Sequence, residues 1–213
     1  VTAAAIDNAR HAPEAADRAQ HQVFVDLMIP IVKGWCTETA QEVTYLGVQV
    51  HGGMGFIEET GAAQHYRDAR IITIYEGTTG IQANDLIGRK TARDGGKAAH
   101  LVAAQIDKVA AKLASNADPS LNAIGLRLAA ATAALQTAID WIVQTFGTNP
   151  RAAHASSVPY LKLWGLCAGG WQMGRAAIAA TETLKSDAGD VAFLRAKIAT
   201  EFGKPAGLFR LTA

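Results

Sequence analysis

The chain has little cysteine and little proline, and it has no excess of either charge. Two cysteines, Cys36 and Cys167, stand far apart in 213 residues, with no CxxC pair. We therefore expect two buried free thiols in a reducing compartment rather than a disulfide scaffold. Lys and Arg number 20 against 19 Asp and Glu, which gives a net charge of +1, and no basic run occurs. This balance disfavours a nucleic acid or an anionic membrane as the partner.

Long apolar runs, export signals and metal-ligand spacings are also missing. No stretch approaches 18 consecutive strongly apolar residues, and the opening residues VTAAAID have neither the basic nor the apolar segment of a signal peptide. The six histidines show no HExxH or i, i+4 pairing, so we expect no metal site. We expect a cytoplasmic protein without membrane insertion and, because the chain begins without Met, a piece of a longer protein.

What the chain does have is helical periodicity. Apolar residues make up 49% of the sequence and recur at spacings of three and four, which predicts an all-α fold. A first helix is expected to start near Pro13 and to be interrupted at Pro30. From there residues 31–50 predict one long, buried helix that ends at the glycines of residues 52–55.

The segment 56–80 is less regular. Its Ile71–Tyr75 stretch is rich in β-branched residues, but because no partner strand is in sight we expect an extended loop. A helix over residues 81–93 should stop at Asp94-Gly95-Gly96, which has the composition of a linker.

Beyond this linker the pattern predicts four helices joined by short polar turns, and hence an antiparallel bundle. Asp190 is expected to cap the last of them, which would carry Val191, Leu194, Ile198 and Phe202. We therefore divide the chain into a first helical domain, residues 1–94, and an additional helical bundle, residues 95–213.

Glu76 is the residue whose surroundings suggest chemistry. It follows the apolar Ile74 and Tyr75 and precedes Gly77. Apolar surroundings would raise its pKa toward the range of a general base, whereas a Glu beside a Gly is also common in solvated turns. The neighbouring loop residues Glu58 and Glu59 are rival candidates for the same role.

Three motifs in order are more specific than any one of them. They are Gln49-x-x-Gly52-Gly53-x-Gly55, Tyr66-Arg67-Asp68-Ala69-Arg70 and Ile74-Tyr75-Glu76-Gly77-Thr78, closing with Ile81-Gln82. Over roughly residues 13–93 the chain resembles the C-terminal helical domain of the flavin-dependent acyl-CoA dehydrogenases. The tail, with Ser157-Val158-Pro159-Tyr160-Leu161 and Gly169-Gly170-Trp171, resembles the extra helical region of the long bacterial members of that family.

The resemblance implies a role for each matching residue. Glu76 would be the catalytic base that removes the α-proton of an acyl-CoA thioester, while a hydride passes to FAD. Its backbone N–H would hold the thioester carbonyl, and Tyr75 and Gly77 would contact the substrate. Gln49, Gly52 and Gly53 would contact the FAD of a neighbouring subunit, and Thr78 would also contact the flavin.

The resemblance also implies partners and a wider context. Electrons would leave through an electron-transfer flavoprotein, the enzyme would be a homo-oligomer, a dimer or a tetramer, and its place would be in fatty acid metabolism. Without the family's N-terminal and middle domains the chain alone would be an inactive part of an enzyme. The alternative is a non-catalytic helical oligomerisation module that lacks flavin. A DNA-acting flavoprotein of the same fold is disfavoured by the near-zero net charge.

Overall fold

The computed structural model describes residues 1–185 and 190–194, and within them the chain is built from helices without a strand, which confirms the all-α prediction. One of the helices, η2, is a π-helix, and η1 is a single 3₁₀ turn. The elements in chain order are α1 (Thr2–His11), α2 (Ala15–His51), α3 (Gly53–Phe56), η1 (Glu58–Thr60), α4 (Ala62–Ile71), α5 (Thr79–Asp85), η2 (Leu86–Ala92), α6 (Lys97–Ala114), α7 (Pro119–Phe146), α8 (Pro150–Ala155) and α9 (Ser157–Lys185).

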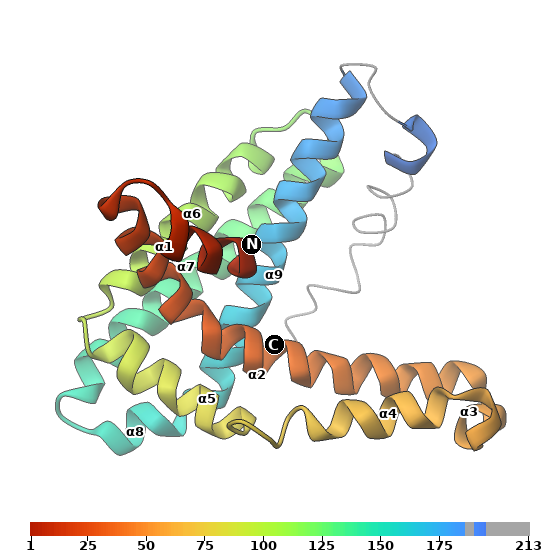
Figure 1. The fold of residues 1–213 in the computed structure, drawn as a ribbon. Coiled ribbons are helices and arrows are strands. Elements are labelled where there is room, and N and C mark those ends of the chain that lie inside the picture. Colours follow the sequence, from red (N-terminus) through yellow and green to blue (C-terminus); the bar gives the residue numbers. More distant parts are fainter. Residues whose placement is uncertain (186–189, 195–213) are drawn as a thin grey trace. The chain divides into compact units, whose positions relative to one another are not determined.

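The helices form two compact units, which are described separately here (Figure 1). Unit 1 comprises Val1–Ala99 and Ile139–Gly165, and unit 2 comprises His100–Ala138 and the residues from Leu166 onward. Three long helices, α6, α7 and α9, contribute residues to both units. The division between residues 94 and 95 that the sequence suggests stays a prediction.

Helix α2 runs for 37 residues through Pro30, so the predicted interruption at that residue is wrong. A proline inside a helix removes one i→i−4 hydrogen bond and usually kinks or breaks it. Here Pro30 is buried together with Leu27 and Ile31. The packing of this apolar stretch therefore outweighs the local preference of proline.

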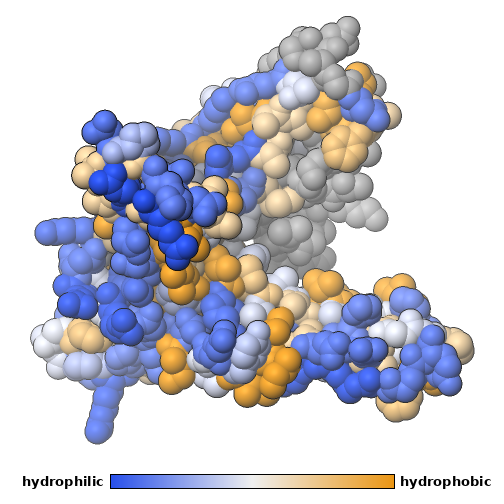
Figure 2. All heavy atoms as spheres, viewed as in Figure 1, coloured by the Kyte–Doolittle hydropathy of each residue, from blue (hydrophilic) through white to orange (hydrophobic). Residues whose placement is uncertain are grey.

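The second half of α2 forms an arm with α3 and α4, which we define as residues 33–72. Helix α4 returns antiparallel along α2, because Lys33 reaches Ile72 and the rings of Tyr45 and Tyr66 lie 6.4 Å apart (Figure 1). Apolar residues are scattered among polar ones on the surface of the arm (Figure 2).

The prediction that the long helix is buried to its end is wrong within this chain. The exposed fraction is 60% at Val43, 50% at Leu46 and 84% at Val50. Trp35 and Glu38 contact α9 and α5, but towards its end this half of α2 packs against α3 and α4, which leave these apolar residues open.

The stretch before Glu76 is a set of tight turns and not the extended loop that we expected. Helix α4 continues to Ile71, and the amides of Ile74 and Tyr75 then donate to the Ile71 carbonyl at 3.0 and 3.2 Å. Thr73 is buried and its hydroxyl donates to the Arg70 carbonyl at 3.1 Å. These local bonds satisfy the backbone without a partner strand.

The helix predicted over residues 81–93 is present as α5 followed by the π-helix η2. The Arg93 amide donates to the Gly88 carbonyl at 3.1 Å, the i→i+5 bond that defines a π-helix. The predicted stop is confirmed, since Gly95 and Gly96 have positive φ. Asp94 accepts from the Gly96 and Ala98 amides at 3.0 and 2.9 Å, and so caps the start of α6.

The interior of unit 1 joins η2 to the first turns of α9. The Thr91 and Tyr160 hydroxyls lie 3.1 Å apart, and Tyr160 packs edge-on against the fully buried Trp164. A Cβ on Gly165 would come within 2.0 Å of Trp35 Cγ, so only glycine lets α9 approach α2 this closely.

Unit 2 is built from three long helices, of which α7 runs antiparallel to α6 and α9 runs parallel to α6. Gln136 on α7 donates to Asp107 on α6 at 2.6 Å. Lys112 pairs with Glu182 on α9 at 2.7 Å. A Cβ on Gly174 would meet Leu113 at 2.8 Å, so the small residue lets α9 come close to α6.

Two predicted features of the tail can be checked. The third of the four helices predicted beyond the linker starts after the turn at residues 147–150, and the structure divides it into α8 and α9 at Ser156. Asp190 does act as a cap, since its carboxylate accepts from the Phe193 amide at 3.0 Å. Ile198 and Phe202 lie outside the described residues.

The cysteines differ from each other. Cys167 is buried, and burial together with the Asp107 charge raises the pKa of its thiol to about 12. Cys36 is exposed on α2, so the prediction of burial is wrong for this residue. It lies on the face of α2 that the described part of unit 1 leaves open.

Helix α7 is long and apolar enough, by length and composition alone, to cross a membrane. Residues 119–146 contain no unbroken apolar run of 18, because polar residues such as Thr132 and Gln136 stand within the apolar stretch. Its large apolar residues Leu128, Leu135 and Ile139 are fully buried, whereas 33% of its most apolar 18-residue stretch is buried.

Candidate functional site

Glu76 lies in the turn between α4 and α5 and has left-handed backbone geometry. Its φ of 54° is the only positive value at a residue other than glycine within the described residues. Such a conformation costs about 1–2 kcal/mol and persists only where the surroundings enforce it. Strain of this kind tends to gather at functional sites.

The Glu76 carboxylate is exposed in this chain, so the predicted apolar enclosure is not formed by the chain itself. The side chains of Ile74 and Tyr75 are themselves 47% and 48% exposed. Within the described residues no hydrogen bond or ion pair engages the carboxylate. A free carboxylate flanked by apolar side chains on an open surface can be desolvated only when something else covers it.

Three residues on the C-terminal side fix this turn. Gln82 donates from Nε2 to the Glu76 carbonyl at 3.5 Å. Gly77 has a φ of 94°, and a Cβ there would come within 2.6 Å of the same Nε2 atom, so the turn requires glycine. Thr78 begins α5, since its hydroxyl accepts from the Ile81 amide at 3.3 Å.

Two charged side chains of α2 hold the same turn from the other side. Lys33 donates to the Ile72 carbonyl, and its Nζ atom lies 5.0 Å from the centroid of the Tyr75 ring. Glu38 accepts a hydrogen bond of 2.5 Å from the hydroxyl of Thr79. No local pattern in the sequence marks either residue as part of the site.

Gln49, Gly52 and Gly53 lie together at the far end of the arm. All three are exposed, and a Cβ on either glycine would have open space around it. Gly52 has a φ of 60° and ends α2, as the glycine cluster predicted. Since Gln49 stands eleven residues beyond Glu38, the two groups of site residues are separated by about 16 Å along the helix.

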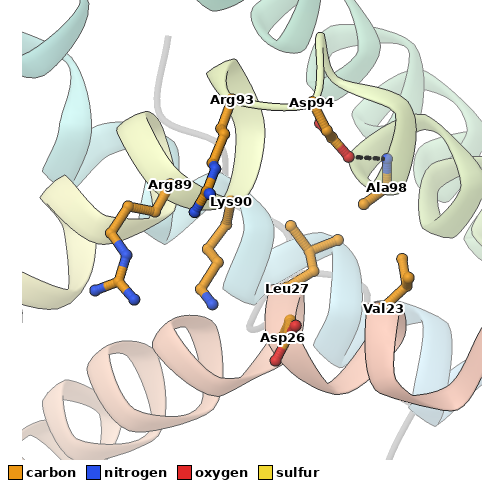
Figure 3. A pocket seen from close by; sticks show the side chains of 8 residues that line it. All are labelled: Val23, Asp26, Leu27, Arg89, Lys90, Arg93, Asp94 and Ala98. Atoms are coloured by element: carbon orange, nitrogen blue, oxygen red, sulfur yellow. Dashed lines mark hydrogen bonds between the residues drawn. The ribbon is translucent and has the colours of Figure 1, made fainter. Parts of the chain in front are cut away.

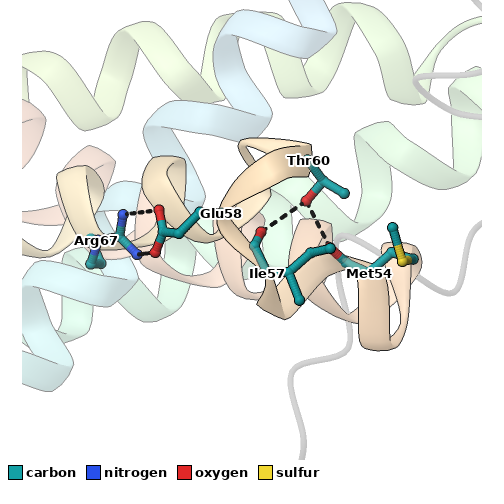
Figure 4. A network of polar contacts seen from close by, with 5 residues as sticks. All are labelled: Met54, Ile57, Glu58, Thr60 and Arg67. Atoms are coloured by element: carbon teal, nitrogen blue, oxygen red, sulfur yellow. Dashed lines mark hydrogen bonds and ion pairs between the residues drawn. The ribbon is translucent and has the colours of Figure 1, made fainter.

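The acidic rival Glu58 is engaged elsewhere (Figure 4). Arg67 binds both of its carboxylate oxygens at 2.7 Å, and Thr60 ties the same loop by donating to the Met54 carbonyl at 2.7 Å. The hydrogen bond and the charge of Arg67 hold the pKa of Glu58 below its usual value. A carboxylate made less basic in this way is a poor proton acceptor, which favours Glu76 over Glu58.

Sequence reasoning missed a cationic pocket of about 520 Å³ between the first half of α2 and η2 (Figure 3). Lys90 and Arg93 extend from η2 toward α2, while Arg89 is paired with Asp85 at 3.2 Å. The spacing Arg89-Lys90-x-x-Arg93, three basic residues within five positions, is the sequence signal that could have indicated it. The lining residues are Val23, Asp26, Leu27, Arg89, Lys90, Arg93, Asp94 and Ala98.

No group of three or more His, Cys, Asp or Glu side chains that could hold a metal ion occurs in the described part of the chain. The candidate chemistry of the site is therefore that of a free carboxylate, an exposed glycine backbone and a cationic pocket.

Comparison with known families matches two successive parts of the chain. The family described as "Acyl-CoA dehydrogenase, C-terminal domain" matches residues 2–90. The family described as "Acetyl-CoA dehydrogenase C-terminal like" matches residues 102–201. Glu76 and the other predicted site residues lie in the first match, and most of unit 2 lies in the second.

Individual relatives agree. The chain is 53% identical over 92% of its length to 3-methylmercaptopropionyl-CoA dehydrogenase from Ruegeria pomeroyi, of which it covers 33%. It is 35% identical over 76% of its length to a broad-specificity linear acyl-CoA dehydrogenase from Mycobacterium tuberculosis, covering 27% of that protein. A butyryl-CoA dehydrogenase from Syntrophomonas wolfei is 33% identical over 88% of the chain, which covers 31% of it.

The chain thus spans about a third of the length of these relatives, all of which are named as oxidoreductases acting on acyl-CoA thioesters. The two matched families and the three sequence motifs indicate the same family. The chain belongs to the acyl-CoA dehydrogenase family, and it corresponds to the family's C-terminal helical part.

Proposed function

We propose that this chain is the C-terminal part of an FAD-dependent acyl-CoA dehydrogenase in which Glu76 is the catalytic base. The observation that supports this proposal most is the free Glu76 carboxylate on a turn whose backbone is strained and anchored. This turn lies within the residues that match the family's C-terminal domain. A base must be unpaired, reachable and fixed in place, and Glu76 meets these three conditions.

Glu76 would remove a proton from the carbon next to the thioester carbonyl. Its backbone N–H has no hydrogen-bond acceptor among the described residues and would donate to the thioester carbonyl oxygen. Such a bond stabilises the negative charge that develops on this oxygen as the proton leaves. Substrate and the rest of the enzyme would cover Ile74 and Tyr75, which would desolvate the carboxylate and make it more basic.

The residues predicted to contact FAD fit an edge contact to a cofactor held largely by other parts of the enzyme. The open backbone at Gly52 and Gly53 permits close approach, and the Gln49 amide is exposed beside it. Thr78 accepts from the Ile81 amide and so keeps its hydroxyl hydrogen to donate outward. When bound, FAD would take up the hydride from the β-carbon of the substrate.

The separation of the two groups along α2 favours a shared site. The resemblance to the family implies that Gln49, Gly52 and Gly53 contact the FAD of a neighbouring subunit. Their distance of about 16 Å along α2 from the level of Glu38 fits a site apart from that of Glu76 in the same chain. We propose a homo-oligomer on this basis, with the exposed apolar residues of the arm at its interface. An electron-transfer flavoprotein would then take the electrons from the reduced enzyme.

The cationic pocket suits the phosphate groups of a CoA thioester. Lys90 and Arg93 have no ion-pair partner among the described residues, and Asp94 is occupied by the amides of Gly96 and Ala98. Arginine and lysine are the usual phosphate-binding side chains.

The exposed arm also favours a second candidate, a helical oligomerisation module without flavin. Visible flavin absorbance of the purified complete protein separates the two functions. Bound flavin supports the dehydrogenase, and its absence supports the module.

The decisive experiment compares Glu76→Gln with the wild type in the complete dehydrogenase, assayed on acyl-CoA substrates with an artificial electron acceptor. We expect turnover to fall by about 10²- to 10⁴-fold, the contribution typical of a general base, with flavin still bound. Glu59→Gln is the matched control, since Glu59 is also an exposed loop carboxylate. Wild-type turnover in Glu76→Gln would remove Glu76 from the mechanism.

A further inference from the structure

We propose that Lys33 is a positioning residue for Glu76, acting from α2 through the turn that precedes the base. This inference rests on the proposed function of Glu76. Glu38 would assist from the other side of the same turn, so that two α2 side chains of opposite charge bracket the base.

The contacts of Lys33 support a role in holding the turn. Its half-buried ammonium donates to the Ile72 carbonyl, at the C-cap position of α4, where helix carbonyls lack partners of their own. A cation at this end of a helix is also favoured by the helix dipole. One side chain of α2 therefore fixes where α4 ends and where the turn toward Glu76 begins.

The same ammonium reaches the residue next to the base. Its Nζ atom lies 5.0 Å from the Tyr75 ring centroid, which is within the range of a cation–π interaction. Tyr75 and Glu76 are adjacent in the chain, so a displacement of the Tyr75 backbone must move the Glu76 backbone with it. Lys33 thus contacts the turn at two points and Glu76 at none.

On the other side of the base Glu38 accepts a hydrogen bond of 2.5 Å from Thr79. Residues 72–75 and residue 79 are in this way attached to two positions on one helix, with Glu76 between them. The left-handed backbone of Glu76 needs external support of this kind, because an isolated glutamate would relax to negative φ.

A misplaced base slows proton transfer more than it weakens binding, and a displacement of about 1 Å can cost on the order of 10²-fold. In the complete dehydrogenase we expect Lys33→Met to lower kcat by about 10- to 100-fold with little change in KM. The kinetic isotope effect of substrate deuterated at the α-carbon should rise, because proton removal becomes more rate-limiting. Lys33→Arg should restore most of the activity.

Lys162→Met, an exposed lysine of α9, is the matched control and should leave kcat and the isotope effect unchanged. Glu38→Ala is a second test of the same turn, and Glu42→Ala, one turn further along α2, is its control. If Lys33→Met does not fold, the result for Glu38→Ala decides whether the α2 side chains position the base. The positioning role is overturned if folded Lys33→Met has the kcat and the isotope effect of the wild type. If Lys33→Met does not fold, the same result in Glu38→Ala overturns it. If Glu76→Gln also keeps full turnover, the proposed function itself fails; if Glu76→Gln is inactive, only the positioning role does.

Discussion

The hydroxyl of Tyr160 lies 3.1 Å from that of Thr91, and both residues are buried in unit 1. Either hydroxyl can be the donor. The contact joins the π-helix η2 to the start of α9, which are 69 residues apart in the chain. It is thus a polar link inside a largely apolar interior, where an unmade hydrogen bond is costly.

Removing one partner of this pair should destabilise the chain. We expect Tyr160→Phe and Thr91→Val each to lower the free energy of unfolding by about 1–3 kcal/mol, because each breaks a buried hydrogen bond. The double variant should cost less than the sum of the two. Urea denaturation followed by circular dichroism measures all three values, and strict additivity would contradict the link.

Tyr160 should also make stability sensitive to alkaline pH. Burial raises the pKa of its hydroxyl to about 12, above the unfolded value of about 10. The native state therefore keeps this proton when the unfolded state has lost it, so stability is complete below pH 10 and declines as the pH rises toward 12.

The measurement is the pH dependence of urea unfolding between pH 9 and about 11.5. Tyr160→Phe should show a shallower decline than the wild type, whereas Tyr66→Phe, which alters an exposed tyrosine of α4, should follow the wild type. Equal slopes in all three proteins would show that Tyr160 does not contribute.

Gly165→Ala should weaken unit 1 by overpacking. The new Cβ would come within 2.0 Å of Trp35 Cγ, and such collisions cost about 1–3 kcal/mol. Gly47→Ala, where the new Cβ meets nothing within 4 Å on a helix, should be neutral or stabilising. Thermal unfolding of both variants checks this, and combining Gly165→Ala with Trp35→Leu should recover part of the loss.

Gly77→Ala should disturb the candidate site more than the fold. The substitution forces a side chain into left-handed backbone and against Gln82 Nε2 at 2.6 Å. Gly61→Ala is a control that has a positive φ of 76° but open space around its Cβ. We expect both to lose about 1–2 kcal/mol of stability from backbone strain, and only Gly77→Ala to lose dehydrogenation in the complete enzyme.

The sequence predicted the helices well where local signals and burial agree. The glycines after His51, the capping Asp94 and Asp190, and the periodicity of the tail all mark real boundaries. It failed at Pro30, where packing overrides a local rule, and at residues 71–75, where β-branched residues form turns closed by local hydrogen bonds.

The site was predictable only in part. The motifs identify Glu76, Gly77 and Thr78 by resemblance, but no periodicity could show that Lys33 and Glu38 hold their turn from another helix. The enclosure of Glu76 could not be seen either, because apolar neighbours in sequence predict burial only if some other surface covers them.

The π-helix η2 has a consequence for the cationic pocket. A π-helix accommodates one more residue per turn than an α-helix would, so the removal of Gly88 would let the segment close into ordinary α-helical bonding. Because the wide π turn absorbs the extra residue, the residues beyond the deletion would keep nearly the same direction around the helix axis. Lys90 and Arg93 would therefore still line the pocket, and the deletion would remove only the wide turn itself.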